Sequence, residues 1–176
     1  FQHEMLSISD ISKIKKPIVW TLHDMWPFCG AEHISYDKRW KEGYKKNNRP
    51  IGESGFDLNR WVWKRKKKHW KNPIQLIATS KWMEETVCES VLMNDWPVET
   101  ISNPLDLNIW KPMDQIQARE CFNLPKNVPL ILFGAIAGTS EFHKGYDLLE
   151  SAIKFISSSS KLKDAHLVVF GQSKPP

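Results

Sequence analysis

The side chains best suited to act on a ligand follow two short apolar runs of the chain. His23 and Asp24 come directly after residues 17–22, and Lys144 closes the loop that follows residues 129–133. A histidine beside a carboxylate can exchange a proton or a hydrogen bond with a substrate hydroxyl. A lysine next to the free N–H groups of a helix start attracts phosphate. The sequence therefore predicts a hydroxyl-binding or acid–base site and an anion site, although each motif also fits an ordinary solvated loop.

The loop at residues 133–145 has the composition of a phosphate-binding turn. Its glycines, Gly134, Gly138 and Gly145, permit a ligand to approach the backbone closely. The loop leads into a helix, because apolar residues recur at helical spacing from residue 148 to residue 156. It matches neither the dinucleotide-binding GxGxxG pattern nor the P-loop pattern, so the loop alone does not specify a nucleotide.

Five short apolar runs predict strands, and helical patterns separate them. We expect strands at residues 17–22, 74–78, 98–101, 129–133 and 165–170, and helices at 8–14, 56–70, 80–92, 114–122 and 145–156. This alternation predicts an α/β fold with parallel sheets. The run at 129–133 has the composition of a strand buried on both faces. A turn at 102–106 divides the chain into expected domains at 1–102 and 103–176, and a serine run at 157–160 predicts a short turn.

Composition and cysteine usage limit the class of protein. The chain has 176 residues, a net charge of +5 and three cysteines, Cys29, Cys88 and Cys121. They lack partners at metal-ligand spacing, so we expect reduced thiols in a cytoplasmic protein and no metal site. His33 either faces the same cleft as His23 or satisfies a loop. No apolar run approaches the ~20 residues of a membrane-spanning helix, and no serine stands in a nucleophile-elbow pattern.

A basic stretch with interleaved tryptophans occupies the predicted helix near residues 57–71. Its consecutive basic residues are Lys64, Arg65, Lys66, Lys67 and Lys68. Three interpretations fit this pattern. The helix can present a solvated face while its tryptophans enter the core, it can lie on an anionic membrane surface, or it can bind nucleic acid. The sequence contains no recognised nucleic-acid-binding module, which disfavours the last interpretation.

Several segments together resemble a known family of enzymes. Residues 17–28, 78–82, 101–106, 132–135 and 143–149 are similar, in order and spacing, to segments of GT-B glycosyltransferases of retaining family 4, which build bacterial surface polysaccharides. The resemblance implies two partial Rossmann-like domains. It implies an acceptor-side domain at residues 1–102 and a domain at residues 103–176 that binds a nucleotide-sugar donor. The implied reaction transfers the sugar with retention to a saccharide or lipid-linked saccharide, at the cytoplasmic face of the membrane.

The resemblance also suggests roles for individual residues. His23 matches a histidine that contacts the donor sugar, Lys144 matches the lysine that neutralises the donor diphosphate, and Gly134 falls in the loop beside that diphosphate. We assign Gly145 to close backbone approach, and Asp24 and His33 to acceptor or cleft contacts. No metal and no cofactor are expected, because the nucleotide-sugar is a substrate and fixed protein charges replace a metal.

The sequence departs from the family pattern at several points. His143 stands where the family often has an arginine, and residues 30–33 read Gly-Ala-Glu-His in place of Gly-Gly-Cys-His. The family's first glycine-rich loop and its paired-glutamate segment are absent, so we expect a fragment that binds donor poorly and turns over little alone. The alternatives are a non-enzymatic α/β module that binds nucleic acid through helix 57–71 and another nucleotide-sugar enzyme, such as an epimerase.

Overall fold

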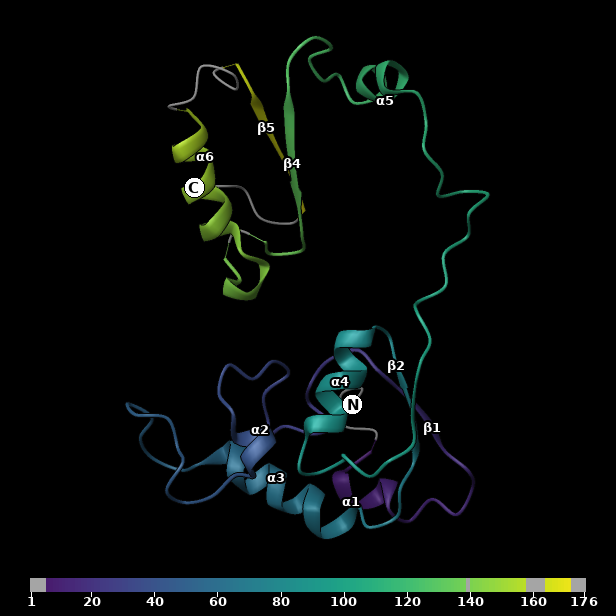
Figure 1. Ribbon diagram of the computed structural model, residues 1–176, viewed down its shortest axis with the longest axis vertical. Helices are drawn as coiled ribbons and strands as arrows, with labels where there is room; N and C mark the ends of the chain where they lie inside the picture. The colour runs from purple at the N-terminus through teal and green to yellow at the C-terminus, as the bar shows by residue number, and fades with distance from the viewer. Residues whose placement is uncertain (1–5, 139, 158–163, 172–176) are drawn as a thin grey trace. The chain divides into compact units, whose positions relative to one another are not determined.

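A computed structural model of the chain describes residues 6–138, 140–157 and 164–171. The chain divides into two compact units, Phe1–Asp106 and Leu107–Pro176. Each unit is built on its own small parallel sheet (Figure 1). Among the described residues, the sheet of the first unit has three strands and that of the second has two. The division falls after Asp106; the turn expected at residues 102–106 is not formed, and the turn residues of this segment are 107–109. The predicted α/β class with parallel sheets is confirmed.

The sheet of the first unit consists of strands β1 (Val19–Leu22), β2 (Gln75–Ala78) and β3 (Val98–Thr100), paired in that order. Ala78 lies in register with Leu22 on one side and with Thr100 on the other. The three strands therefore end at a common edge. In parallel α/β sheets this carboxyl edge is where ligands bind.

The described part of the first unit has four helices: α1 (Ile8–Ile11), α2 (Arg39–Glu42), α3 (Leu58–His69) and α4 (Lys81–Glu89). Polar side chains cap the starts of α3 and α4. Asp57 accepts a hydrogen bond from the Arg60 N–H (2.9 Å), and Ser80 accepts one from the Met83 N–H (3.2 Å). Helix α1 is shorter than predicted, because Ile14 is 42% exposed and no apolar burial supports another turn.

The core of the first unit joins the sheet to the helices. Its fully buried members include Leu22, Phe28, Leu76, Val87 and Met93. Three tryptophans link separate segments: Trp70 at the end of α3 packs edge-on against Trp20 of β1 and Trp26, with ring centroids 5.4 Å and 6.0 Å away. The segment that follows β1 is thus packed against α3.

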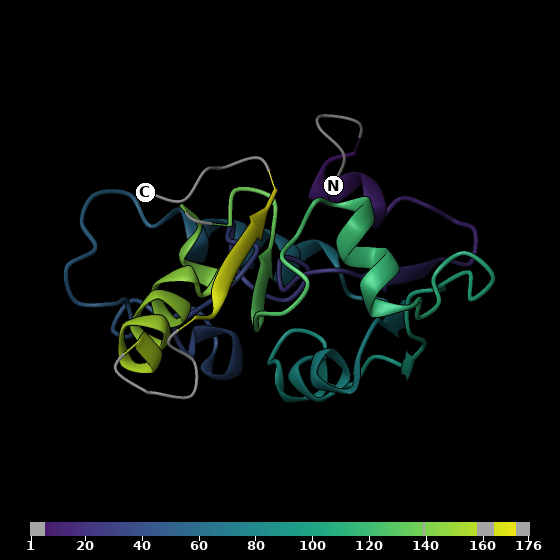
Figure 2. The same cartoon turned by 90° about the horizontal axis from the view of Figure 1, so that it is seen from above.

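The second unit contains helix α5 (Gln115–Cys121), strand β4 (Leu130–Gly134), a 3-10 turn η1 (Phe142–Lys144), helix α6 (Tyr146–Ser157) and strand β5 (His166–Phe170). Strands β4 and β5 pair in parallel along their full length, from Leu130 opposite His166 to Gly134 opposite Phe170. Helix α6 connects them and lies beside the pair (Figures 1 and 2).

The prediction that residues 129–133 form a strand buried on both faces is wrong. Phe133 packs against Tyr146 of α6, with ring centroids 5.4 Å apart. Leu132 points to the opposite face, because successive side chains of a strand alternate, and it is 66% exposed. In the described part of the second unit, α6 covers the sheet face that carries Phe133 and not the face that carries Leu132. The serine turn expected at 157–160 lies largely outside the described residues.

Candidate functional site

His23 and Asp24 lie at the carboxyl edge of the first sheet, as the sequence predicts. Strand β1 ends at Leu22, whose side chain is fully buried, and the next residue, His23, is exposed. The Thr79 hydroxyl, just after β2, donates a hydrogen bond to the Leu22 carbonyl (3.3 Å). This contact fixes the ends of the two neighbouring strands side by side and places His23 at their shared edge.

Asp24 and His33 are joined by a side-chain hydrogen bond across the loop that follows β1. Asp24 Oδ2 lies 2.6 Å from His33 Nδ1, and Asp24 Oδ1 accepts a hydrogen bond from the Trp26 N–H (2.9 Å). The loop closes through the Met25 N–H, which donates to the His33 carbonyl (2.9 Å). The side chains are 36% and 66% exposed, so a ligand can reach them. With Nδ1 directed at the carboxylate, His33 presents Nε2 to solvent.

Lys66 of α3 holds the same loop from inside the protein. Its side chain is fully buried, and Nζ donates hydrogen bonds to the carbonyls of Trp26, Cys29 (3.1 Å) and Gly30 (2.6 Å). The ammonium also lies 3.8 Å from the centroid of the Trp26 ring. Burial lowers the pKa of Lys66 to about 7, although the charges of Glu32 and Asp24 act to raise it.

Two further side chains hold the N–H groups of this loop. The Gly30 N–H donates to the Tyr44 hydroxyl (3.0 Å), which in turn donates to Glu32, and the Ala31 N–H donates to Asn59 Oδ1 of α3 (3.0 Å). A side chain at Gly30 would be blocked, because a Cβ there would lie 2.6 Å from the Asn59 Cα. Burial raises the pKa of the Tyr44 hydroxyl, which therefore remains a donor to Glu32.

The sequence interpretation missed Lys66 as a partner of this loop and placed it in the exposed basic stretch. That placement is wrong, because the Lys66 side chain is fully buried. The helical pattern contains the signal: Val62, Lys66 and the buried Trp70 recur every four residues and share one face of α3. A lysine at an apolar helix position needs an internal set of acceptors.

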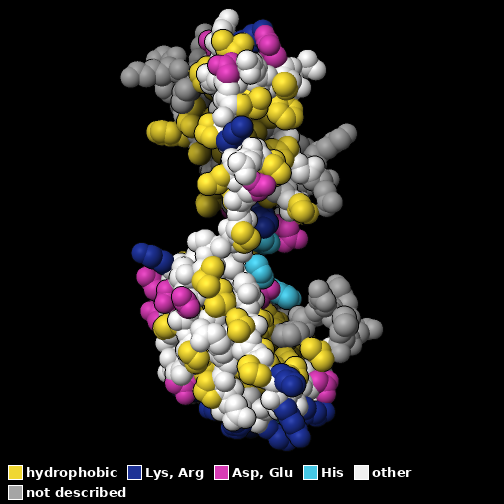
Figure 3. Space-filling model, turned by 90° about the vertical axis from the view of Figure 1, so that its right-hand side faces the viewer, with side chains coloured by type: hydrophobic (Ala, Val, Ile, Leu, Met, Phe, Trp, Pro, Cys, Tyr) yellow, Lys and Arg dark blue, Asp and Glu magenta, His cyan; other side chains and the backbone are white. Residues whose placement is uncertain are grey.

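The rest of the basic stretch lies at the protein surface. Lys64, Lys67 and Lys68 are exposed, and Arg65 is half-buried with its guanidinium 4.7 Å from the centroid of the Trp61 ring. Figure 3 shows lysine and arginine side chains concentrated at the lower end of the first unit, where Figure 1 places α3. The tryptophans of α3 differ in burial: Trp63 is buried, and Trp61 is 46% exposed.

The predicted anion site begins with two structurally constrained glycines. Gly134 ends β4 opposite Phe170, and a Cβ at Gly134 would lie 2.0 Å from the Phe170 ring. Packing of the sheet therefore requires glycine at this position independently of any ligand. Gly145 adopts a left-handed conformation (φ 72°, ψ 26°) between η1 and α6, which glycine adopts without strain.

Lys144 is exposed at the start of α6, where the N–H groups of a helix point outward. The first bond of this helix runs from the Leu149 N–H to the Gly145 carbonyl (3.1 Å), so the N–H groups of residues 146–148 have no acceptor within the helix. The N–H groups of Lys144 and Gly145 instead close η1, by donating to Glu141 and Phe142. The anion-binding capacity of this loop thus lies in the Lys144 ammonium and the first turn of α6.

Carboxylates also lie near this helix start. A hollow of about 190 Å³ is lined by Ser140, Glu141, Phe142, Tyr146 and Asp147. Glu141 Oε2 lies 3.6 Å from His143 Nδ1. Asp147 interacts favourably with the helix dipole but repels a bound phosphate. The Lys144 charge is therefore essential if an anion is to bind here.

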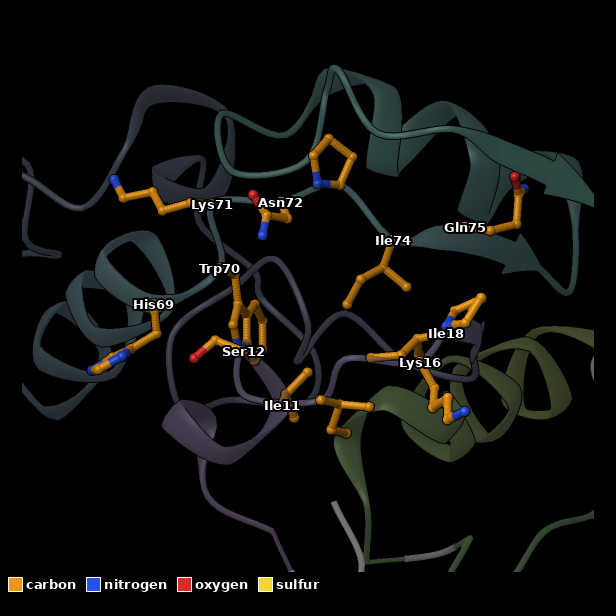
Figure 4. Close-up of a pocket in the computed structure, with 13 residues that line it drawn as sticks. Ile11, Ser12, Lys16, Ile18, His69, Trp70, Lys71, Asn72, Ile74 and Gln75 are labelled. Carbon is orange, nitrogen blue, oxygen red and sulfur yellow. The ribbon is translucent and has the colours of Figure 1, made fainter.

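A larger pocket, of about 360 Å³, lies at the opposite, amino-terminal edge of the first sheet. Its lining includes residues just before β1 and β2, such as Ile18 and Ile74. Figure 4 shows Trp70 and Ile74 directed toward its centre, while His69 and Lys71 point away. None of the predicted site residues lines this pocket.

Searches for metal sites and membrane spans in the described residues found neither. No group of three or more His, Cys, Asp or Glu side chains in these ranges is arranged to hold a metal ion. No helix in the same ranges has the length and apolar character needed to cross a bilayer. Comparison of the chain with protein-family models, with curated proteins and with solved structures found no match.

Proposed function

We propose that this protein is a retaining glycosyltransferase that moves a sugar from a nucleotide-sugar to a saccharide or a lipid-linked saccharide. The observation that supports this proposal is the position of His23 and the Asp24–His33 pair at the carboxyl edge of a parallel sheet. His23 and Asp24 belong to the segment 17–28 that resembles family 4 glycosyltransferases, and His33 lies beyond it. A polar pair at this edge suits the binding of sugar hydroxyls, since ligands of parallel α/β sheets bind there.

The donor is proposed to bind in the second unit, with its diphosphate at the start of α6. When the glycosidic bond to the diphosphate breaks, negative charge grows on the departing oxygens. The Lys144 ammonium and the N–H groups at residues 146–148 stabilise that charge more strongly in the transition state than in the ground state. Lys144 must also offset Asp147, so the proposal predicts a large effect of removing its charge.

The acceptor is proposed to bind at the Asp24–His33 pair. Asp24 orients the imidazole through Nδ1, which leaves Nε2 of His33 as an acceptor for a sugar hydroxyl. His23, one residue before Asp24, is proposed to contact the transferred sugar. No residue is assigned as a covalent nucleophile, in keeping with the expected mechanism of retention.

The donor site is tested by nucleotide binding to the 176-residue chain. UDP, GDP and ADP are titrated by calorimetry against the wild type, Lys144→Ala and Lys154→Ala. Lys154 is the matched control, because it is an exposed lysine near the other end of the same helix and pairs with Glu150. We expect one nucleotide to bind weakly and Lys144→Ala to lower this affinity by about a further tenfold or more, the loss expected for one charge-assisted contact. Equal affinity of all three proteins would contradict the assignment.

Catalysis is tested by nucleotide release from UDP-, GDP- and ADP-sugars. We expect release with one donor class, and a strong decrease in His23→Ala. Analysis of the products distinguishes transfer to an acceptor from epimerisation of the donor. Nucleotide release at the wild-type rate in both Lys144→Ala and His23→Ala would refute the site.

An anionic membrane surface is proposed as a partner of the exposed basic residues of α3. Lys64, Lys67 and Lys68, at about 1 kcal/mol per charge, give about 100-fold stronger binding to vesicles with phosphatidylglycerol than to neutral vesicles. Alanine at these three positions should abolish this preference. Alanine at the exposed lysines 38, 45 and 46 is the control with equal charge loss. Salt-sensitive binding to duplex DNA, with no vesicle binding, would favour the nucleic-acid-binding alternative.

A further inference from the structure

Lys66 satisfies all the hydrogen-bonding capacity of its ammonium within one loop. A lysine ammonium carries three donor hydrogens and no acceptor. Its three acceptors are the carbonyls of Trp26, Cys29 and Gly30, and all belong to the loop between Asp24 and His33. The contact spans about forty residues of sequence, so it ties α3 to a distant segment.

This arrangement is unusual in its choice of partners. The cost of burying a charge is most often offset by an opposite charge. Lys66 instead uses three backbone dipoles and the face of the Trp26 ring, 3.8 Å from Nζ to its centroid. Each of these contacts with Nζ fixes the direction of one peptide group, or of the Trp26 ring, in the loop. The lysine therefore determines loop conformation in a way that a buried apolar side chain cannot.

We infer that Lys66 is the positioning residue that sets the geometry of the Asp24–His33 pair, by holding the intervening loop against α3. The inference deepens the proposed function and rests on it for the chemical role of the pair. The loop carries both members of the pair, and its closing bond joins Met25 to His33. A change in the peptide groups at residues 26–30 thus changes the separation of Asp24 and His33.

The remaining contacts of the loop cannot replace Lys66. Tyr44 and Asn59 accept hydrogen bonds from the N–H groups of Gly30 and Ala31, whereas Lys66 donates to carbonyls. Without Lys66, the inward-facing carbonyls of Cys29 and Gly30 lose this donor. Since burying an unpaired carbonyl is costly, these peptide groups are expected to rotate toward water. The helix containing the basic stretch thereby supports the site on the neighbouring sheet edge.

Amide hydrogen exchange and NMR of the histidine ring test this inference in the 176-residue chain. The variants are Lys66→Met, which keeps the side-chain length, Lys66→Arg, which keeps the charge, and Lys71→Met as the control. Lys71 is exposed just beyond the end of α3. Exchange is followed at Gly30 and Ala31 in the loop and at residues 76–78 in β2. The ring ¹⁵N shifts of His33 report the hydrogen bond from Nδ1 to Asp24.

The expected result is local. Lys66→Met should speed exchange at Gly30 and Ala31 by tenfold or more, leave residues 76–78 at the wild-type rate and shift the ¹⁵N signal of His33 Nδ1. Lys66→Arg should behave like Lys66→Met, because a planar guanidinium cannot direct three donors from one atom. Wild-type exchange in the loop would overturn the inference, as would an equal acceleration in β2 or full rescue by arginine.

A measurement on the wild type keeps the inference testable if Lys66→Met does not fold. Through-bond NMR couplings between Lys66 ¹⁵Nζ and the carbonyl carbons of Cys29 and Gly30 report the hydrogen bonds directly. Below pH 7, where Lys66 carries its proton, protected ammonium protons with these couplings support the inference, and exchange as fast as that of the exposed lysines overturns it. These measurements need no activity. Failure of donor binding at Lys144 would therefore refute the proposed function without affecting this result.

Discussion

Raising the pH above 7 should stabilise the first unit through a single side chain, Lys66. Burial lowers the pKa of this lysine from 10.5 to about 7. In the unfolded chain it keeps its proton up to about pH 10.5. Between these values the unfolded state binds more protons, so the free energy of unfolding rises with pH. This gain in the free energy of unfolding is complete above the pKa that Lys66 has in the unfolded chain. It is lost as the pH falls to the pKa that Lys66 has in the folded state.

The size of the effect follows from the difference between the two pKa values. The change from 10.5 to about 7 corresponds to about 5 kcal/mol, at about 1.4 kcal/mol per pKa unit. Between pH 7 and pH 8.5 the expected gain is about 1.5 kcal/mol. Measurements should stop near pH 8.5, because burial also raises the pKa of the Cys29 thiol. Ionisation of that thiol in the unfolded chain would lower stability at higher pH.

Urea unfolding followed by tryptophan fluorescence is the appropriate assay. Every tryptophan except Trp110 belongs to the first unit, so the signal reports mainly on the unit that contains Lys66. The wild type is compared with Lys66→Met at several pH values, and the difference between the two stability curves isolates the lysine. We expect this difference to change by about 1.5 kcal/mol from pH 7 to pH 8.5. Parallel curves would refute the reasoning and mean that the three carbonyls keep the ammonium charged.

Three further changes should alter stability in urea unfolding. Gly134→Ala should destabilise the second unit by about 1–3 kcal/mol, because its Cβ would lie 2.0 Å from the Phe170 ring. The double variant with Phe170→Ala should recover part of this loss, and no recovery would contradict the clash. Leu76→Ala should cost about 2–5 kcal/mol, since Leu76 is fully buried in β2; a smaller loss would mean that the core closes around the gap. Ser80→Ala should cost about 1 kcal/mol by removing the cap of α4, and Ser80→Asp should retain it.

Local sequence patterns predicted the elements of the fold well. The polar residues Ser80 and Asp114 cap the starts of α4 and α5, with Asp114 Oδ1 accepting hydrogen bonds from the N–H groups of Ile116 and Gln117 (3.0 Å each). Such features depend on residues close together in the chain. Burial was harder to predict, because it depends on what packs across each face. The apolar run in β4 resembles that of a fully buried strand, yet Leu132 is 66% exposed.

The candidate site was predicted in part. The sequence placed Asp24 at the sheet edge and suggested His33 as a possible neighbour, but their 2.6 Å contact results from the closing of the loop. That closing depends on Lys66, which lies far away in the sequence. Five adjacent basic residues indicate a charged surface. Only their positions around the helix show that Lys66 lies on the buried face. Local composition cannot show which backbone carbonyls accept a hydrogen bond from a residue far away in the sequence.

The three cysteines make the native sequence suitable for spectroscopic labelling. Cys88 in the first unit and Cys121 in the second are exposed, whereas Cys29 is buried in the loop held by Lys66. A thiol-reactive dye pair can therefore attach one reporter to each unit without engineered residues. Alkylation of Cys29 requires the loop to open, so its slow labelling rate would measure how often the Asp24–His33 loop leaves its closed conformation.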